Sequence, residues 1–210
     1  MNFAEYNVKD ANLEEILLAL KSLDTVEAVA LGGSRSTGAS DENSDYDIYI
    51  YCAEISTAET RENLLGKYCS IAEFGNHYWE SEDNTVMNNG IPVDIIYREV
   101  DRFGRYIDTV IKGGKAFNGY TTAFWHNIKN SKVLFDKTGS FTKFRDMAQI
   151  DFPENLRSAI IKNNRNLLNG KLPSYDRQIK KAQERGDIVS VNHRITAFLE
   201  SYFDVIFALN

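Results

Sequence analysis

The chain has 210 residues, enough for one large core or for two small domains that share an interface. Hydrophobic residues make up 43% of it and prolines number only three, which excludes a disordered, proline-rich protein. The net charge of −6 argues against a protein that holds nucleic acid through many phosphates, because such binding needs a basic surface. The charge is uneven, with −8 over residues 1–150 and +2 over residues 151–210.

Membrane and metal-thiol classes are also disfavoured. No apolar run approaches the roughly 20 residues that span a bilayer, and Met1 to Glu5 lack the basic start and apolar stretch of a signal peptide. We therefore expect a cytoplasmic protein without a membrane partner. Cys52 and Cys69 form no C-x-x-C pair and no ligand cluster, so we expect structural free thiols.

The first elements along the chain are a helix, a strand, a turn and a second strand. Apolar residues at helical spacing from Leu13 to Leu23 predict an amphipathic helix, and residues 26–31 read as a short buried strand. Glycine and serine in residues 32–38 favour a turn. Residues 45–51 alternate, which predicts a strand with Tyr46, Ile48 and Ile50 on one side and Asp45, Asp47, Tyr49 and Tyr51 on the other.

The remaining elements change character after Pro153. Before it we expect helices at residues 57–68, 106–111, 121–128 and 142–147, and strands at residues 77–82, 85–87, 91–98 and 132–135. Asn88-Asn89-Gly90 predicts a hairpin turn. After it, helical periodicity covers residues 155–169, 175–185 and 188–209.

These patterns predict an α+β fold, in which a mixed β-sheet flanked by helices is followed by a helical C-terminal subdomain. The predicted boundaries are 1–150 for the first domain and 151–210 for the second. The apolar end at residues 207–210 carries no helix-capping signal, which leaves room for a natural protein that continues beyond Asn210.

Two carboxylates on one strand face are the first candidates for chemistry. Residues two apart on a strand point the same way at roughly 6–7 Å, so Asp45 and Asp47 repel each other unless a cation lies between them. Hard divalent cations with oxygen ligands, such as Mg²⁺, fit this arrangement. The alternative is a solvated acidic strand face, the usual location of such a pair.

Asp94 interrupts the otherwise apolar strand at residues 91–97. A buried, unpaired charge there is costly, which leaves two interpretations. Asp94 faces solvent from an edge strand, as Pro92 suggests, or it completes a metal site with Asp45 and Asp47.

The Gly33-Ser34 turn is the second half of the candidate site. Glycine lets a backbone approach a phosphate closely, and N–H groups at a following helix start favour an anion, although the sequence is not a Walker A motif. Arg35 is a candidate phosphate ligand from this turn, although a solvated surface charge is the more common role of such a side chain. The aromatic pairs Tyr78-Trp79 and Phe124-Trp125 either stack on a ligand or, more commonly, pack in the core.

Together, Leu31-Gly32-Gly33-Ser34, the strand motif Asp45-Tyr46-Asp47 and the later Asp94 resemble the signature of the DNA polymerase beta-type nucleotidyltransferase superfamily. The resemblance covers about residues 26–98. A short catalytic domain followed by helices is similar to the aminoglycoside and lincosamide nucleotidyltransferases and to uncharacterised bacterial relatives.

This resemblance implies that Asp45, Asp47 and Asp94 hold two Mg²⁺ ions, and that Gly33 and Ser34 bind the phosphates of a nucleoside triphosphate such as ATP as co-substrate. An acceptor hydroxyl would attack the α-phosphorus and pyrophosphate would leave, with Asp94 as the candidate for removing the acceptor proton.

The acceptor separates the remaining hypotheses. The first is transfer to a small-molecule acceptor, such as an antibiotic, and not to a nucleic-acid polymer. The second is nucleotide transfer to a protein partner, as in antitoxins of this superfamily, and the third is a noncatalytic nucleotide-binding module. The sequence leaves the acceptor, the nucleotide and the oligomeric state open.

Overall fold

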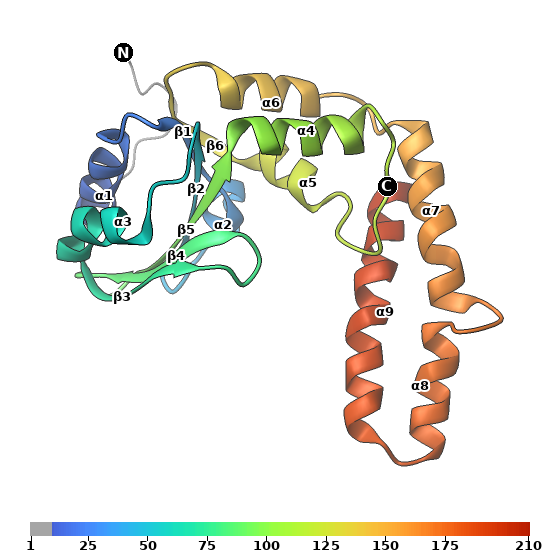
Figure 1. Cartoon of the computed structure of the whole chain (residues 1–210). Coiled ribbons are helices and arrows are strands. Elements are labelled where there is room, and N and C mark those ends of the chain that lie inside the picture. Colours follow the sequence, from blue (N-terminus) through green and yellow to red (C-terminus); the bar gives the residue numbers. More distant parts are fainter. Residues whose placement is uncertain (1–9) are drawn as a thin grey trace. The chain divides into compact units, whose positions relative to one another are not determined.

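The computed structural model of the chain describes residues 10–210 and divides into two compact units (Figure 1). The sheet unit is the described part of Met1–Arg105 together with Asn127–Met147, and the helical unit is Tyr106–His126 together with Ala148–Asn210. Residues 1–5, on which the expectation of a missing signal peptide rests, lie outside the described residues. The helical unit thus takes in a segment that lies well before the boundary predicted at residue 150.

A six-stranded mixed sheet forms the centre of the sheet unit, with strand order β3-β4-β5-β2-β1-β6. The strands are β1 (Val26–Leu31), β2 (Tyr46–Cys52), β3 (Cys69–Asn76), β4 (Ser81–Met87), β5 (Pro92–Glu99) and β6 (Lys132–Asp136). Only β2 and β5 pair in parallel, and the other neighbours are antiparallel. The α+β fold class predicted from the sequence is confirmed.

One face of the sheet is closed by apolar packing against α1 (Ala11–Lys21) and α3 (Ala58–Leu65), which Figure 1 shows on the same side of the sheet. The side chain of Asp10 caps α1 by accepting hydrogen bonds from two N–H groups of its first turn. The alternating residues Tyr46, Ile48 and Ile50 lie in this core as the pattern predicted. Burial of this apolar face stabilises the sheet.

The opposite face of the sheet is covered in part by aromatic rings. Tyr51 is fully buried there, and its ring centroid lies 5.4 Å from that of Phe103, 5.1 Å from Phe141 and 6.0 Å from Phe144. These phenylalanines come from α4 (Val100–Ile111) and α6 (Ser140–Ala148). The other short helices are α2 (Gly33–Thr37), η1 (Gly66–Tyr68) and α5 (Ala123–Asn130).

The helical unit contains the three long C-terminal helices that the periodicity predicted. They are α7 (Glu154–Asn169), α8 (Tyr175–Glu184) and α9 (Ile188–Leu209), and α9 packs against both α7 and α8. A buried amide of Asn164 on α7 donates to Asp204 of α9 over 3.2 Å. Among the described residues no helix is both long and apolar enough to cross a membrane.

The strand predicted at residues 77–82 is wrong, and β3 at Cys69–Asn76 was missed. β3 is an edge strand with most of its residues exposed or half-buried, so it carries no clean alternation of apolar and polar residues. Residues 77–80 instead connect β3 to β4. The hairpin turn at residues 88–90 is confirmed, because the backbone N–H of Met87 donates to the carbonyl of Ile91 across it.

A buried ion pair ties α3 to the core face of β4. Arg61 donates to both carboxylate oxygens of Asp83, over 2.7 and 2.8 Å, and the two residues are 2% and 0% exposed. Asp83 also accepts the backbone N–H of Gly75 over 2.8 Å. Removing the carboxylate alone leaves a buried cation without its partner, which is more costly than replacing the whole pair.

We therefore expect Asp83→Ala to lower the free energy of unfolding by about 3–5 kcal/mol, measured by urea denaturation. Asp108→Ala is the matched control, because Asp108 and Lys112 form an exposed pair and such a pair contributes about 1 kcal/mol or less. Equal losses in the two variants would contradict a special role for the buried pair.

Candidate active site

The parallel register of β2 and β5 brings two of the predicted carboxylates together. Asp47 is the direct partner of Asp94 across these strands, so the two side chains lie on the same face of the sheet. Asp45 immediately precedes β2 and shares the face of Asp47 by the alternation of the strand. The edge-strand interpretation of Asp94 is wrong, because β5 lies between β4 and β2.

The glycine turn after β1 packs directly against one of these carboxylates. Gly33 begins α2 at a φ of +59°, and a Cβ atom placed on it would lie 1.7 Å from Oδ2 of Asp47. The backbone N–H of Gly32 donates to the carbonyl of Asp47 over 2.8 Å, which holds the turn at this distance. Only glycine provides both the positive φ and the space, so its backbone and the carboxylate are in contact.

Arg35 organises the loop that leads into β2. Its guanidinium donates to the backbone carbonyls of Ser44 and Asp45 and lies 4.0 Å from the centroid of the Tyr46 ring. These contacts hold the backbone at Asp45 and thereby place its carboxylate at the start of the strand. The role of Arg35 in nucleotide binding stays a prediction.

The electrostatics of the site are those of crowded carboxylates. Burial and, to a smaller extent, the negative charges of Asp45 and Asp94 together raise the pKa of Asp47 to about 6. Both neighbouring carboxylates therefore act on Asp47 through space. A cation between them would remove this repulsion and favour the ionised form.

The donor chemistry of this set fits a hard divalent cation such as Mg²⁺, because all three candidate ligands are carboxylates. The contact of Gly33 with Asp47 adds backbone at which a phosphate can approach the same site. Within residues 10–210 there is no group of three His, Cys, Asp or Glu side chains already drawn together tightly enough to hold an ion. The assignment of Asp45, Asp47 and Asp94 as metal ligands thus stays a prediction.

Two further carboxylates on β4 and in the turn before it flank the site, and the sequence reasoning missed both. Glu82 is the direct partner of Ile96 and therefore lies on the same face as Asp94, and burial and the charges of Asp94 and Glu80 raise its pKa. The carboxylate of Glu80 is paired with Arg98, which donates to both of its oxygens over 2.7 and 2.8 Å.

Arg98 is the second feature that sequence reasoning missed. It lies four residues after Asp94 on the same face of β5, only 5% exposed, and also donates to Tyr51 and Asn127 over 3.0 Å each. The Tyr49 ring lies 4.3 Å from its guanidinium carbon and in turn packs against Gly32. An arginine in an apolar strand at this spacing is the sequence signal that could have found it.

The two aromatic pairs have different environments. Trp125 is 6% exposed and its indole N–H donates to the carbonyl of Ala148 over 2.8 Å, so it is a core residue of the helical unit. Tyr78 and Trp79 are 71% and 88% exposed in the connection between β3 and β4. The core interpretation therefore holds for Trp125 and not for the earlier pair.

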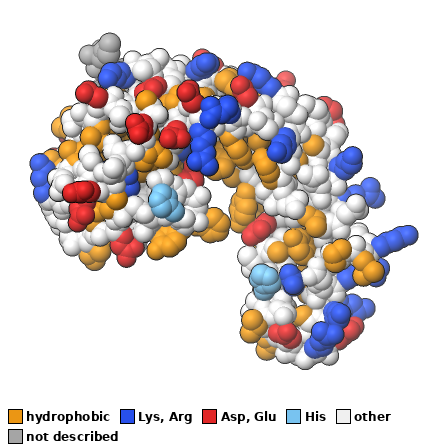
Figure 2. All heavy atoms as spheres, in the orientation of Figure 1, with side chains coloured by type: hydrophobic (Ala, Val, Ile, Leu, Met, Phe, Trp, Pro, Cys, Tyr) orange, Lys and Arg blue, Asp and Glu red, His pale blue; other side chains and the backbone are white. Residues whose placement is uncertain are grey.

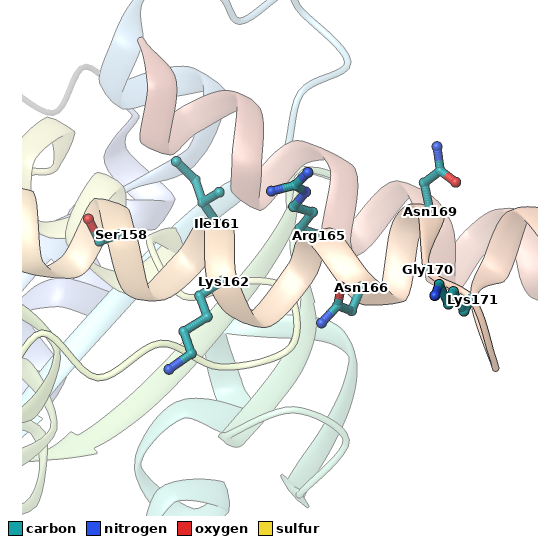
Figure 3. A pocket seen from close by; sticks show the side chains of 8 residues that line it. All are labelled: Ser158, Ile161, Lys162, Arg165, Asn166, Asn169, Gly170 and Lys171. Atoms are coloured by element: carbon teal, nitrogen blue, oxygen red, sulfur yellow. The ribbon is translucent and has the colours of Figure 1, made fainter.

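A separate hollow of about 550 Å³ lies along α7 in the helical unit (Figure 3). Its lining includes Lys162, Arg165 and Lys171 and no carboxylate. Figure 3 shows the side chains of Lys162 and Asn166 pointing to one side of the helix and Arg165 to the other. The hollow lacks acidic ligands, so it does not compete with the carboxylate site as a metal centre.

Comparison with known proteins gives two family matches. Residues 13–117 match the model described as a nucleotidyltransferase domain, which is half of the chain. Residues 122–210 match a model described as a domain of unknown function, DUF4037. The search of curated proteins gives no match.

Three solved structures resemble the chain at low identity. A nucleotidyltransferase-like protein from Exiguobacterium sibiricum has a TM-score of 0.42 and 10% identity over 90% of this chain and 53% of that one. A toxin-antitoxin structure with AMP-PNP has a TM-score of 0.40 and 15% identity over 74% and 94%. An aminoglycoside 6-adenyltransferase from Bacillus subtilis has a TM-score of 0.37 and 12% identity over 90% and 62%. The chain spans about half the length of the first, and no substrate is inferred from matches this distant.

The raised pKa of Asp47 predicts a pH-dependent effect of its neutralisation. The folded pKa lies above the unfolded value, so ionisation of Asp47 costs stability as pH rises through about 4 to 6, and this cost is fully present above pH 6. We expect Asp47→Asn to raise the thermal unfolding midpoint at pH 7.5 in EDTA, with a smaller difference at pH 4.5.

Asp41 provides a control of opposite sign. Hydrogen bonds from Ser44 and Asn43 lower the pKa of this exposed carboxyl, so its ionised form stabilises the fold above its ordinary pKa. Asp41→Asn should lower the midpoint at pH 7.5. A fall in midpoint for Asp47→Asn at that pH would contradict the repulsion described above.

Proposed function

The chain belongs to the nucleotidyltransferase domain family, and on this basis we propose that it transfers a nucleoside monophosphate from a nucleoside triphosphate to a hydroxyl of an acceptor, releasing pyrophosphate. The observation that carries the proposal is the contact of three features at one place. Asp94 pairs with Asp47 across the sheet, and Asp47 touches the backbone of Gly33.

In this proposal Asp45, Asp47 and Asp94 hold Mg²⁺ and the triphosphate binds beside them. When bound, Mg²⁺ supplies the positive charge that stabilises the attacking and leaving oxygens of phosphoryl transfer. The N–H groups of the Gly33-Ser34 turn bind phosphate oxygens, which glycine permits because no side chain intervenes.

The remaining roles belong to side chains around this centre. Arg35 holds the loop that carries Asp45, and we retain it as a candidate phosphate ligand. Asp94 is our candidate for accepting the proton of the acceptor hydroxyl, because it lies beside Asp47 on an interior strand. Positioning and electrostatics would then account for most of the catalysis.

For the acceptor we propose a small molecule. Residues 157–185 carry eight Lys and Arg against two acidic residues, and Figure 2 shows blue side chains along the α7 and α8 side of this unit. This surface belongs to the helical unit and the proposed metal ligands belong to the sheet unit, so it does not define the class of acceptor. Transfer to a protein partner uses the same carboxylates and is the second candidate.

The first test is mutation of the proposed ligands. We expect Asp45→Asn or Asp47→Asn to reduce Mg²⁺-dependent pyrophosphate release at least about 100-fold, because each removes a charge that holds the cation. Asp41→Asn, exposed in the loop before β2, removes the same charge outside the site and should retain activity. Full turnover by Asp47→Asn would sink the assignment.

The second test identifies the acceptor. The four α-³²P-labelled ribonucleoside triphosphates are incubated with Mg²⁺ and hydroxyl-bearing antibiotics of different charge, cell extract, or the protein alone. We expect label on a small molecule, separated by thin-layer chromatography. Label on a protein band and on no small molecule would support the second candidate and contradict the small-molecule proposal.

A further inference from the structure

Four neighbouring strands each contribute one polar residue to a single row across the sheet. Glu73 on β3 pairs with Asn84 on β4, Asn84 pairs with Asp94 on β5, and Asp94 pairs with Asp47 on β2. Partners in register lie on the same face, so the row continues from the candidate metal ligands to the edge of the sheet. Asn84 is the one uncharged member of this row.

Hydrogen bonds fix the amide of Asn84 in one orientation. Its Nδ2 donates to Oδ1 of Asp94 over 2.9 Å, and its Oδ1 accepts from Nδ2 of Asn76 over 2.8 Å. The same nitrogen of Asn76 lies 3.2 Å from a carboxylate oxygen of Glu73. A flipped Asn84 would place its oxygen against a carboxylate and its nitrogen against another nitrogen, so only one orientation is compatible with both neighbours.

The residue type at position 84 also sets the charge of the row. An aspartate there has the same shape and no donor, and it would give four consecutive carboxylates across the sheet. Adjacent like charges on paired strands are destabilising. Asparagine instead supplies a donor to Asp94 and separates its charge from that of Glu73.

We propose that Asn84 is a positioning residue for the metal site. Its amide fixes the carboxylate of Asp94 so that one oxygen is held and the other is available to a divalent cation. This proposal rests on the proposed function. Hydrogen bonds to metal-ligating carboxylates orient them, and their loss commonly weakens metal affinity by about 10–100-fold. Asn84 touches neither cation nor substrate in this role and acts through Asp94.

The test is a double-mutant cycle on cation binding without nucleotide. Mn²⁺ shares the oxygen ligands of Mg²⁺ and serves as the probe, titrated by calorimetry into the full chain. We expect Asn84→Leu, which removes the donor at similar volume, to raise the Kd at least about 10-fold. In an Asp94→Asn background the same substitution should cause no further loss, because the carboxylate that Asn84 orients is already gone.

Three control variants distinguish loss of the Asn84 hydrogen bond from a change of charge and from a loss of folding. Asn84→Asp should also weaken binding, although it adds a negative charge, because the donor is lost. Asn169→Leu, at an exposed position on α7, should bind as the wild type does. If Asn84→Leu does not fold, as judged by circular dichroism, Asn84→Ala carries the same expectation.

Each contrary outcome has a distinct meaning. An unchanged Kd for Asn84→Leu, or equal losses in both backgrounds, overturns the role of Asn84 and leaves the proposed transfer reaction standing. A tighter Kd for Asn84→Asp overturns it as well, since charge and not orientation would then govern binding. Failure of the wild-type chain to bind Mn²⁺ overturns both this inference and the metal-dependent function.

Discussion

The parallel pairing of β2 with β5 is the constraint on which the rest of the structure depends. Parallel neighbours cannot be joined by a tight turn, so the chain between them must leave the sheet and return. That excursion supplies α3 and the β3-β4 hairpin before β5 enters between β4 and β2. The pairing then sets Asp94 beside Asp47, an arrangement in which burial and like charge disfavour the ionised form of Asp47.

One face of the sheet carries the packing that stabilises the fold, and the other carries the candidate active site. On the face covered by α1 and α3, the ion pair of Arg61 with Asp83 is buried, and its charges are hydrogen-bonded to each other. On the opposite face the polar side chains differ in how far they are buried and hydrogen-bonded. Arg98 is buried and fully engaged, whereas Asp47 and Asp94 are half-buried and keep acceptor capacity. Stability and ligand binding therefore place opposite demands on neighbouring residues of the same strands.

The sequence predicts best where period and burial agree. β1 has the predicted bounds and is almost entirely buried, and the alternation of β2 placed Asp47 on the correct face. The local sequence pattern did not decide between the edge-strand and the metal-site interpretations of Asp94, because strand order is a long-range property that no local pattern encodes. β3 was missed for a related reason, since an exposed edge strand needs no apolar alternation. The contact between Asn84 and Asp94 likewise depends on register between β4 and β5.

The division between the two units does not follow a linker. In the described part of the chain, each change of unit, after Arg105, His126 and Met147, falls inside a helix, namely α4, α5 and α6. Ala116, in the segment that joins the helical unit early, accepts a hydrogen bond from Asn163 of α7 over 3.1 Å. A fragment ending near residue 150 would contain residues 106–126 without the C-terminal helices of the same unit. Exchange of C-terminal modules between relatives would therefore have to carry residues 106–126 along with the last three helices.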